Sequence, residues 1–215
     1  MLDIIEEIRH SLAQDLPGER AHQLMNIRGR LPASDALHLD PPPRNSAVML
    51  ILFPENNKWN LVLIQRPDYD GVHSGQIAFP GGKAEPGDAD LLSTAMRESQ
   101  EEIGINTDEL IPVGSLSTVY IPPSNFLVHP FVSILPAKPN LIPDPREVQD
   151  IIYSPASQFI GDEKVQIHQV PMQQSGLIMK VPAYQLENHI VWGATAMILA
   201  EFMAVCGTIL QKHEP

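Results

Sequence analysis

"GGKAEPGDADLLSTAMRESQEEIGI", residues 81–105, is the stretch that decides the fold. It opens with a glycine pair, and a backbone without side chains can approach another group closely. Residues 89–103 then have the composition of a helix, and Gly104 is typical of the residue that ends one. The stretch therefore predicts a glycine-rich turn that leads directly into a helix.

One flank of this predicted helix carries three acids, Glu98, Glu101 and Glu102. At about 100° per residue they span about 100° of the helix surface, beside an apolar stripe of Leu92, Met96 and Ile103. Carboxylates at this spacing repel one another, and Arg97 is the only Lys or Arg between residues 84 and 137. The cluster is therefore either a solvated acidic face or a site for a divalent cation such as Mg²⁺ or Mn²⁺, which prefers oxygen ligands. Arg97 pairs either with Glu101 or with Asp88 in the preceding turn.

Length and charge limit the class of protein. The chain has 215 residues, of which 43% are hydrophobic, enough for one domain with an appended segment. We predict an N-terminal helix and proline-rich linker over residues 1–45, packed on a compact domain of residues 46–215. The net charge of −12 argues against nucleic acid or an anionic membrane as the main partner. No apolar run approaches about 20 residues and no signal peptide is evident, so we expect a cytoplasmic protein without a membrane span.

Apolar runs, turn residues and helical periodicity alternate along the chain, which indicates a mixed α/β layer fold. The expected elements are a helix over residues 2–15, a hairpin over 47–67 with Asn56 and Asn57 at its turn, a short strand within 74–82, strands within 113–125 and 126–137, a strand and a short helix within 145–160, a second hairpin over 164–186, and a last helix that begins in "HIVWGATA", residues 189–196.

The segment from Gly82 to Ile105 resembles the Nudix box, G-x5-E-x7-R-E-U-x-E-E-x-G-U, where U is a bulky apolar residue. The matching positions are Gly82, Arg97, Glu98, Glu101, Glu102, Gly104 and Ile105. Asp88 replaces the first Glu, eight residues separate it from Arg97, and Ser99 fills an apolar position. The resemblance implies an α/β/α sandwich around a mixed, partly antiparallel sheet. The first 40 or so residues fall outside it, and their periodicity predicts an N-terminal helical extension.

An Asp with the eight-residue spacing resembles the coenzyme A pyrophosphatase branch of this superfamily. The upstream stretch "LVLIQRPDYDGVHSGQIAFPGG" is similar to that branch's signature at Leu63, Arg66, Gly75 and residues 79–82, and departs from it at Pro67 and Gly71. The resemblance implies a metal-dependent pyrophosphohydrolase that cleaves the diphosphate of coenzyme A or its thioesters to 3′,5′-ADP and 4′-phosphopantetheine. Hydrolysis of ADP-ribose, NADH or another nucleoside diphosphate derivative stays open, as does a non-catalytic nucleotide-binding module.

The resemblance also assigns roles to individual residues. The metal ligands for Mg²⁺ or Mn²⁺ are Glu98, Glu101, Glu102 and the Gly82 carbonyl. The expected catalytic residues are Glu101, Glu147 and Arg97, with either glutamate as the base. The residues expected to contact a small nucleotide substrate of the coenzyme A type are Arg66, His73, Gln76 and Lys83, with Arg66 as a candidate for the 3′-phosphate. The structural alternatives are plain surface positions for Glu147, Arg66 and Lys83, and a loop-stabilising role for His73. A homodimer also stays open.

Overall fold

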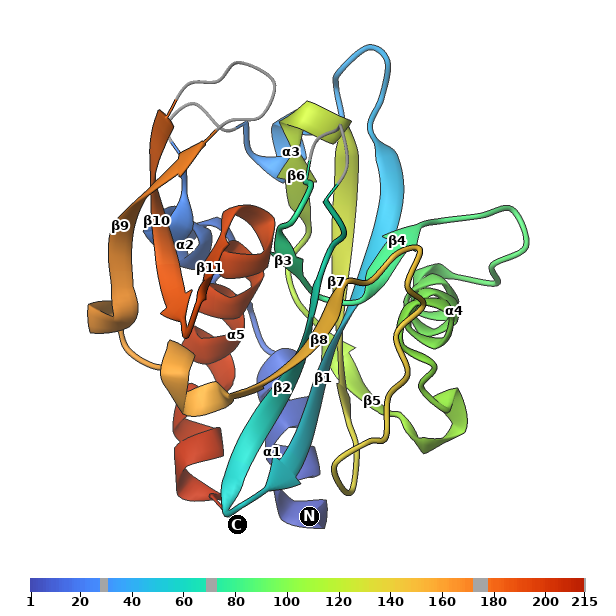
Figure 1. Cartoon of the computed structure of the whole chain (residues 1–215), viewed down its shortest axis with the longest axis vertical. Coiled ribbons are helices and arrows are strands. Elements are labelled where there is room, and N and C mark those ends of the chain that lie inside the picture. The colour runs from blue at the N-terminus through green and yellow to red at the C-terminus, as the bar shows by residue number, and fades with distance from the viewer. Residues whose placement is uncertain (28–30, 69–72, 172–177, 215) are drawn as a thin grey trace.

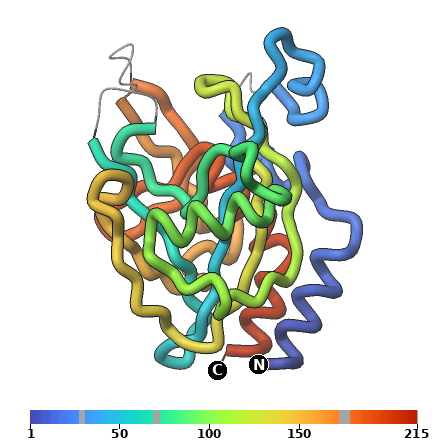
Figure 2. The backbone as a smooth tube through the Cα atoms, turned by 90° about the vertical axis from the view of Figure 1, so that its right-hand side faces the viewer, coloured from blue at the N-terminus to red at the C-terminus, as the bar shows by residue number. Residues whose placement is uncertain are grey.

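The computed structural model describes residues 1–27, 31–68, 73–171 and 178–214 (Figure 1). Helices cover both faces of a central sheet. The α-helices of the described part are α1 (Leu2–Leu12), α2 (Glu19–His22), α3 (Ala33–Ala36), α4 (Leu91–Ile103) and α5 (Gly193–Lys212). α4 lies on one face of the sheet, in front of it in Figure 2, and α5 and α1 lie on the other. This α/β/α arrangement confirms the predicted fold class.

The central sheet mixes parallel and antiparallel pairs. Its strands are β1 (Arg44–Glu55), β2 (Lys58–Gln65), β3 (Ile77–Ala78), β4 (Gly81–Lys83), β5 (Ile111–Ser115), β6 (Val119–Ile121), β7 (Phe126–Ile134) and β8 (Asp150–Pro155). The order is β3-β2-β1-β7-β5, with β4 paired to β1, β6 to β7 and β8 to β2. Only β1 and β7 run parallel among these described pairs.

Alternation along β1 divides the core in two. Leu50 and Leu52 point to the side of α1 and α5, whereas Met49 and Ile51 point to the side of α4, and all four are fully buried. Successive strand residues face opposite sides, so one strand supplies both cores. The same alternation places Ser46 and Val48 on the α5 side of the sheet, where the functional cleft lies.

The two predicted hairpins are present. Asn56 and Asn57 have φ of 53° and 58° at the β1–β2 turn, the left-handed conformation that two-residue hairpin turns need. The second hairpin joins β9 (Val165–Pro171) and β10 (Ile178–Leu186); the part of it at residues 172–177 lies outside the described residues, as does Gly71.

The last helix begins within the predicted stretch, but the residues before it form a strand that the sequence did not predict. Residues His189–Trp192 form strand β11, which pairs with β10 and completes a separate sheet of order β11-β10-β9. The stretch contains the β-branched pair Ile190 and Val191, which suits a strand. The helix α5 begins at Gly193, whose φ of 66° turns the chain.

The helix of the quoted stretch forms as predicted but presents a different face to the core. Asp90 caps it by accepting a hydrogen bond from the Ser93 N–H at 2.7 Å, and Gly104 ends it in the left-handed conformation. The residues it buries are Thr94, Ala95, Ser99, Glu102 and Ile103. Of the predicted apolar stripe, Ile103 is buried, but Leu92 and Met96 are only partly buried. The helix buries Glu102 as well, which hydropathy alone places in solvent.

The N-terminal segment packs on the same core as α5. Ile4, Ile5 and Ile8 of α1 are buried in a cluster shared with α5. Glu7 accepts hydrogen bonds from Lys212 at 2.7 Å and from His213 at 3.0 Å, so the two ends of the chain lie side by side (Figures 1 and 2). α1 ends at Leu12, short of the predicted residue 15. The division of the chain near residue 45 stays a prediction.

The expectation that no apolar run approaches 20 residues does not hold for α5. By length and composition this 20-residue helix could cross a membrane, with a mean hydropathy of 1.7 over its most apolar window. Within the described part of the chain, 61% of that window is buried inside the molecule. A buried core helix passes the same test, and Glu201 lies fully buried within it.

Candidate active site

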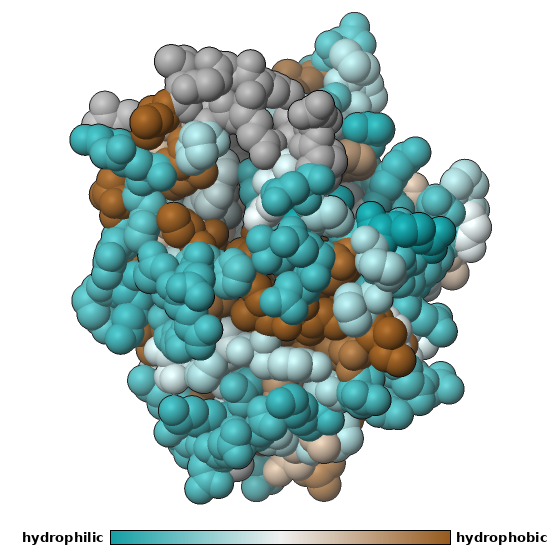
Figure 3. Space-filling model, viewed as in Figure 1, coloured by the Kyte–Doolittle hydropathy of each residue, from teal (hydrophilic) through white to brown (hydrophobic). Residues whose placement is uncertain are grey.

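A cleft of about 1300 Å³ lies between the central sheet and the smaller sheet. Its floor includes Ser46 and Val48 of β1 and Val128 of β7, and its walls come from the segments around β3, β6, β11 and the start of α5. Figure 3 shows the side of the molecule seen in Figure 1, where hydrophobic side chains are exposed across the middle and hydrophilic side chains surround them. The acids Glu98, Glu102 and Glu147 also line the cleft. Residues far apart in sequence therefore meet in one concave surface.

The glycine pair and two helix acids fit closely together. The Gly81 N–H donates to Glu102 Oε2 at 2.8 Å. A Cβ atom at Gly82 would lie 2.3 Å from Glu98 Oε2, and one at Gly81 would lie 2.3 Å from the Ala47 carbonyl oxygen. No side chain fits at either position without displacing a neighbour. The glycines are needed here because the backbone lies directly against the carboxylates.

The carboxyl groups of Glu98 and Glu102 both have raised pKa values. Burial raises the pKa of Glu102 to about 8, against the Gly81 hydrogen bond and the charge of Arg66, and with a contribution from the negative charges of Glu98 and Glu147. Glu102 is only 2% exposed. Burial likewise raises the pKa of Glu98, against its hydrogen bond from Arg97. Burial disfavours the ionised form of both carboxylates, and the nearby arginines offset this effect only in part.

Arg97 makes both pairings that the sequence left open. Its Nε donates to Asp88 Oδ1 at 2.9 Å, and its Nη1 lies 2.8 Å from Glu98 Oε1 and 3.0 Å from Glu101 Oε2. Its Nη2 reaches the Lys83 carbonyl oxygen at 3.1 Å. The Arg97 hydrogen bonds are the largest cause that lowers the pKa of Asp88 far below its ordinary value. Arg97 thus ties the turn to the helix and positions Glu98.

Glu101 lies apart from the other two helix acids. Its side chain is 56% exposed, whereas that of Glu98 is 13% exposed. Arg97 Nη1 contacts both carboxylates, so its positive charge offsets the repulsion between Glu98 and Glu101. Glu98 and Glu102 therefore line the cleft together, whereas Glu101 is more exposed and does not belong to the described cleft lining.

The loop before β8 brings Glu147 to the cleft. The Asp144 N–H donates to the Glu102 carbonyl oxygen at 2.9 Å, and the Glu147 and Val148 N–H groups donate to the Asp144 carbonyl oxygen. Val148 is 2% exposed and anchors the loop in the core. Backbone hydrogen bonds thus fix Glu147, at the cleft wall, to the end of the helix that carries Glu98 and Glu102.

The four residues predicted to contact substrate all line the cleft. Arg66 has a buried Nε without a hydrogen-bond partner in the described part of the chain. His73 Nδ1 lies 3.0 Å from Gln76 Oε1 and its Nε2 lies 3.4 Å from Ser124 Oγ, which agrees with a loop-stabilising role. Lys83 is exposed next to Gly82.

Sequence reasoning missed Arg44, which also lines the cleft. Its guanidinium carbon lies 4.2 Å from the centroid of the Phe126 ring, and its Nη2 donates to the Ser124 carbonyl oxygen at 3.0 Å. The sequence placed Arg44 in a linker after three prolines. Strand alternation with Ser46 and Val48 is the signal that could have found it, once the face of that strand is known.

The oxygen atoms at the acid end suit a hard divalent cation. Glu98, Glu102 and Glu147, with the carbonyl groups of the glycine turn, are the donor types that Mg²⁺ and Mn²⁺ prefer. Among the residues that the structure describes, no three His, Cys, Asp or Glu side chains converge into a ready-made metal site. The assignment of these residues as metal ligands stays a prediction.

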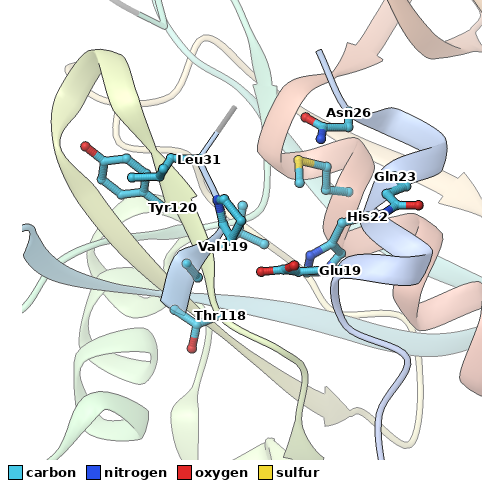
Figure 4. A pocket seen from close by; sticks show the side chains of 11 residues that line it. Glu19, His22, Gln23, Asn26, Leu31, Thr118, Val119 and Tyr120 are labelled. Atoms are coloured by element: carbon cyan, nitrogen blue, oxygen red, sulfur yellow. The ribbon is translucent and has the colours of Figure 1, made fainter. Parts of the chain in front are cut away.

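A second, smaller pocket of about 120 Å³ lies away from the acids (Figure 4). Glu19 and His22 of α2 line one side, and Thr118 and Tyr120 line another. Its lining contains neither Gly82 nor any of the four acids discussed above, and it lacks Lys and Arg within the described residues. The large cleft is therefore the candidate active site.

Comparisons with known proteins agree with the fold and the site. A family model described as the NUDIX domain matches residues 43–173. An uncharacterised Nudix hydrolase named NudL, from Photorhabdus laumondii, is 33% identical over 76% of this chain and 89% of its own. The Nudix hydrolase RenU from M. smegmatis superposes with a TM-score of 0.54 at 14% identity, over 78% of this chain and 88% of its own. A MutT/nudix family protein from Enterococcus faecalis superposes with a TM-score of 0.51 at 15% identity, over 98% of this chain and 76% of its own.

These matches identify the class of protein. The chain belongs to the Nudix family, as the matched domain covers more than half of it. It is a Nudix-type enzyme, a hydrolase of phosphoanhydride bonds. Hydrolases of this family generally use divalent metal ions such as Mg²⁺ or Mn²⁺.

Proposed function

We propose that this protein is a metal-dependent pyrophosphohydrolase that cleaves the diphosphate of coenzyme A or its thioesters. The observation that carries the catalytic part is the placement of Glu98 and Glu102 against the glycine turn, with Glu147 entering the same cleft. Three acids around one concave surface repel one another unless a cation binds among them. A diphosphate carries the opposite charge and can share that cation.

Metal binding, phosphate binding and positioning fall to different residues. Glu98, Glu102 and the Gly82 carbonyl would hold the divalent ion, with Glu101 as a further ligand. The bound ion supplies positive charge that stabilises the diphosphate as its P–O bond breaks. Arg66, beside Glu102, is placed to pair with a diphosphate oxygen. Arg97 acts as a positioning residue, since it holds Glu98 and Glu101 rather than facing substrate.

A general base must orient the attacking water and accept its proton. Glu147 and Glu101 are the two candidates. Glu147 lines the cleft close enough to act on the charges of Glu98 and Glu102, whereas Arg97 already pairs with Glu101. We favour Glu147, because the loop that carries it is fixed to the end of α4 and its carboxylate has no ion-pair partner in the described structure.

The shape of the cleft supports coenzyme A as the substrate. About 1300 Å³ is more than a diphosphate fills, and the cleft continues from the acids to an apolar wall. Met179, Ile190 and Trp192 of the smaller sheet belong to this wall. Coenzyme A combines a diphosphate with a long, weakly polar pantetheine arm that such a wall could cover. A homodimer and a cytoplasmic location remain separate proposals.

A substrate panel tests the proposed function. With Mg²⁺ or Mn²⁺ we expect coenzyme A to yield 3′,5′-ADP and 4′-phosphopantetheine, with a kcat/KM at least about tenfold above that for ADP-ribose or NADH. Chromatography of the products with mass detection gives both identity and rate. Rapid cleavage of ADP-ribose alongside intact coenzyme A would reject this substrate, and binding without turnover of any nucleotide would indicate a non-catalytic module.

Gly82→Ala is expected to keep the fold but to lower kcat by about tenfold to a hundredfold, because a misplaced catalytic group costs that much. The new Cβ would lie 2.3 Å from Glu98 Oε2 and force the carboxylate to move. Gly87→Ala is the matched control, since a Cβ there meets nothing within 4 Å. Thermal unfolding of both variants checks the fold. Normal turnover in Gly82→Ala would show that the position of Glu98 is unimportant.

A further inference from the structure

The cations of this acidic protein are unevenly placed. Most arginines with a described ion pair serve α4 or surface turns, as Arg97 and Arg146 do. Arg44, Arg66 and Lys83 line the cleft, and within the described residues none of them forms an ion pair with a carboxylate. In a chain of net charge −12 with 26 acids, three cleft cations without a direct ion pair favour an anionic ligand.

These cations lie at two separate places. Arg66 is beside Glu102, at the acid end of the cleft. Arg44 lies four residues before Val48 on β1, and Val48 pairs with Gly81. At about 3.3 Å per residue, the backbone of Arg44 is about 13 Å along the strand from that glycine. Arg44 is therefore placed for an anionic group other than the one bound at the glycine turn.

Two neighbours of Arg44 fix the orientation of its guanidinium group. Phe126 is its partner in the β1–β7 register, and the guanidinium carbon lies 4.2 Å from that ring's centroid. One Nη2 bond to the Ser124 carbonyl oxygen fixes the edge of the group. A guanidinium has five N–H donors, so several remain available toward the cleft. Ser124 in turn contacts His73, which joins this wall to the loop before β3.

We propose that Arg44, supported by Phe126, binds the 3′-phosphate of the substrate while the acid end holds the diphosphate. The proposal rests on the proposed function, because coenzyme A carries these two anionic groups on opposite sides of one ribose. A planar guanidinium with free N–H groups binds a phosphate through two parallel hydrogen bonds. Arg44 would then make the enzyme prefer coenzyme A to nucleotides that lack the 3′-phosphate.

Dephospho-coenzyme A, which lacks only this phosphate, gives the sharpest test. For Arg44→Ala we expect kcat/KM with coenzyme A to fall at least about tenfold, and kcat/KM with dephospho-coenzyme A to change less than about twofold. Arg44→Lys should recover part of the loss, because it restores the charge without the planar fork. Arg20→Ala is the matched control, an exposed arginine of α2 outside the cleft.

A binding measurement separates recognition from turnover. Without metal, calorimetry on the wild-type protein should give a lower Kd for 3′,5′-ADP than for 5′-AMP, and Arg44→Ala should remove the difference. Equal losses for both coenzyme A substrates, or no loss for either, would overturn the assignment of Arg44. If the wild type cleaves neither of them but cleaves ADP-ribose, the proposed function itself fails, and the assignment of Arg44 fails with it.

Discussion

Glu98→Gln and Glu102→Gln are each expected to lower kcat by at least about a hundredfold, the usual cost of removing one preorganised charge-stabilising group. Each change removes a negative charge but keeps nearly the same shape. Glu102 is 2% exposed and bonded to the Gly81 N–H, so an amide there has little room to turn toward solvent. The loss should therefore come from weaker cation binding and not from a collapsed loop.

Initial rates with coenzyme A across a range of Mn²⁺ concentrations measure this loss. Excess Mn²⁺ should recover part of the activity of either variant if cation binding is what was weakened. Glu163→Gln, at an exposed position of the segment before β9, is the matched control and should behave as the wild type. A rate like the wild type in either variant would contradict the assignment of that residue as a metal ligand.

Glu201→Ala is expected to lower the free energy of unfolding by about 3–5 kcal/mol, the usual cost of removing one partner of a buried pair. Glu201 is fully buried on α5. Its oxygens accept from the Gly18 N–H at 2.9 Å, from the Ser117 Oγ at 2.6 Å and N–H at 3.0 Å, and contact His22 Nε2 at 3.1 Å. The variant leaves donors from two distant segments without an acceptor.

Urea unfolding followed by circular dichroism measures this change. Thr208→Ala, at an exposed position on the same helix, is the matched control and should cost less than about 0.5 kcal/mol. A loss below about 1 kcal/mol in Glu201→Ala would show that this network does not hold the N-terminal segment to the core.

The same network should make stability depend on pH. Burial raises the pKa of Glu201, but the hydrogen bonds from His22 and Ser117 outweigh burial, and the pKa lies below its ordinary value of 4.5. A carboxylate with a lowered folded-state pKa stabilises the fold above its unfolded pKa, and this contribution is lost as the pH falls through the folded pKa. Glu201→Gln should lack this part of the acid-induced loss.

The sequence predicted the elements whose signals are local. The glycine turn, the helix ending at Gly104 and the Asn56–Asn57 hairpin each depend on a few adjacent residues, and all three form. The sequence also offered Asp88 and Glu101 as alternative partners of Arg97, and both pairings form. The box therefore located the candidate site before its geometry was known.

Features that depend on distant segments could not be predicted in this way. His22 and Glu201 are 179 positions apart, and only the packing of α2 on α5 brings them together. The burial of Glu102 was missed because hydropathy predicts that an acid on the flank of a helix faces solvent. The strand β11 was missed because its four residues run directly into α5, and their partner β10 decides their conformation.

Binding of Mn²⁺ in solution tests the central claim most directly, namely that Glu98 and Glu102 hold a divalent cation at the substrate cleft. Electron paramagnetic resonance of free Mn²⁺ counts the ions bound per chain. The account predicts at least one bound ion in the wild-type protein and a Kd at least about tenfold higher in the Glu98→Gln/Glu102→Gln double variant. Equal Mn²⁺ affinity in both proteins, or no binding by the wild type with coenzyme A present, would contradict it.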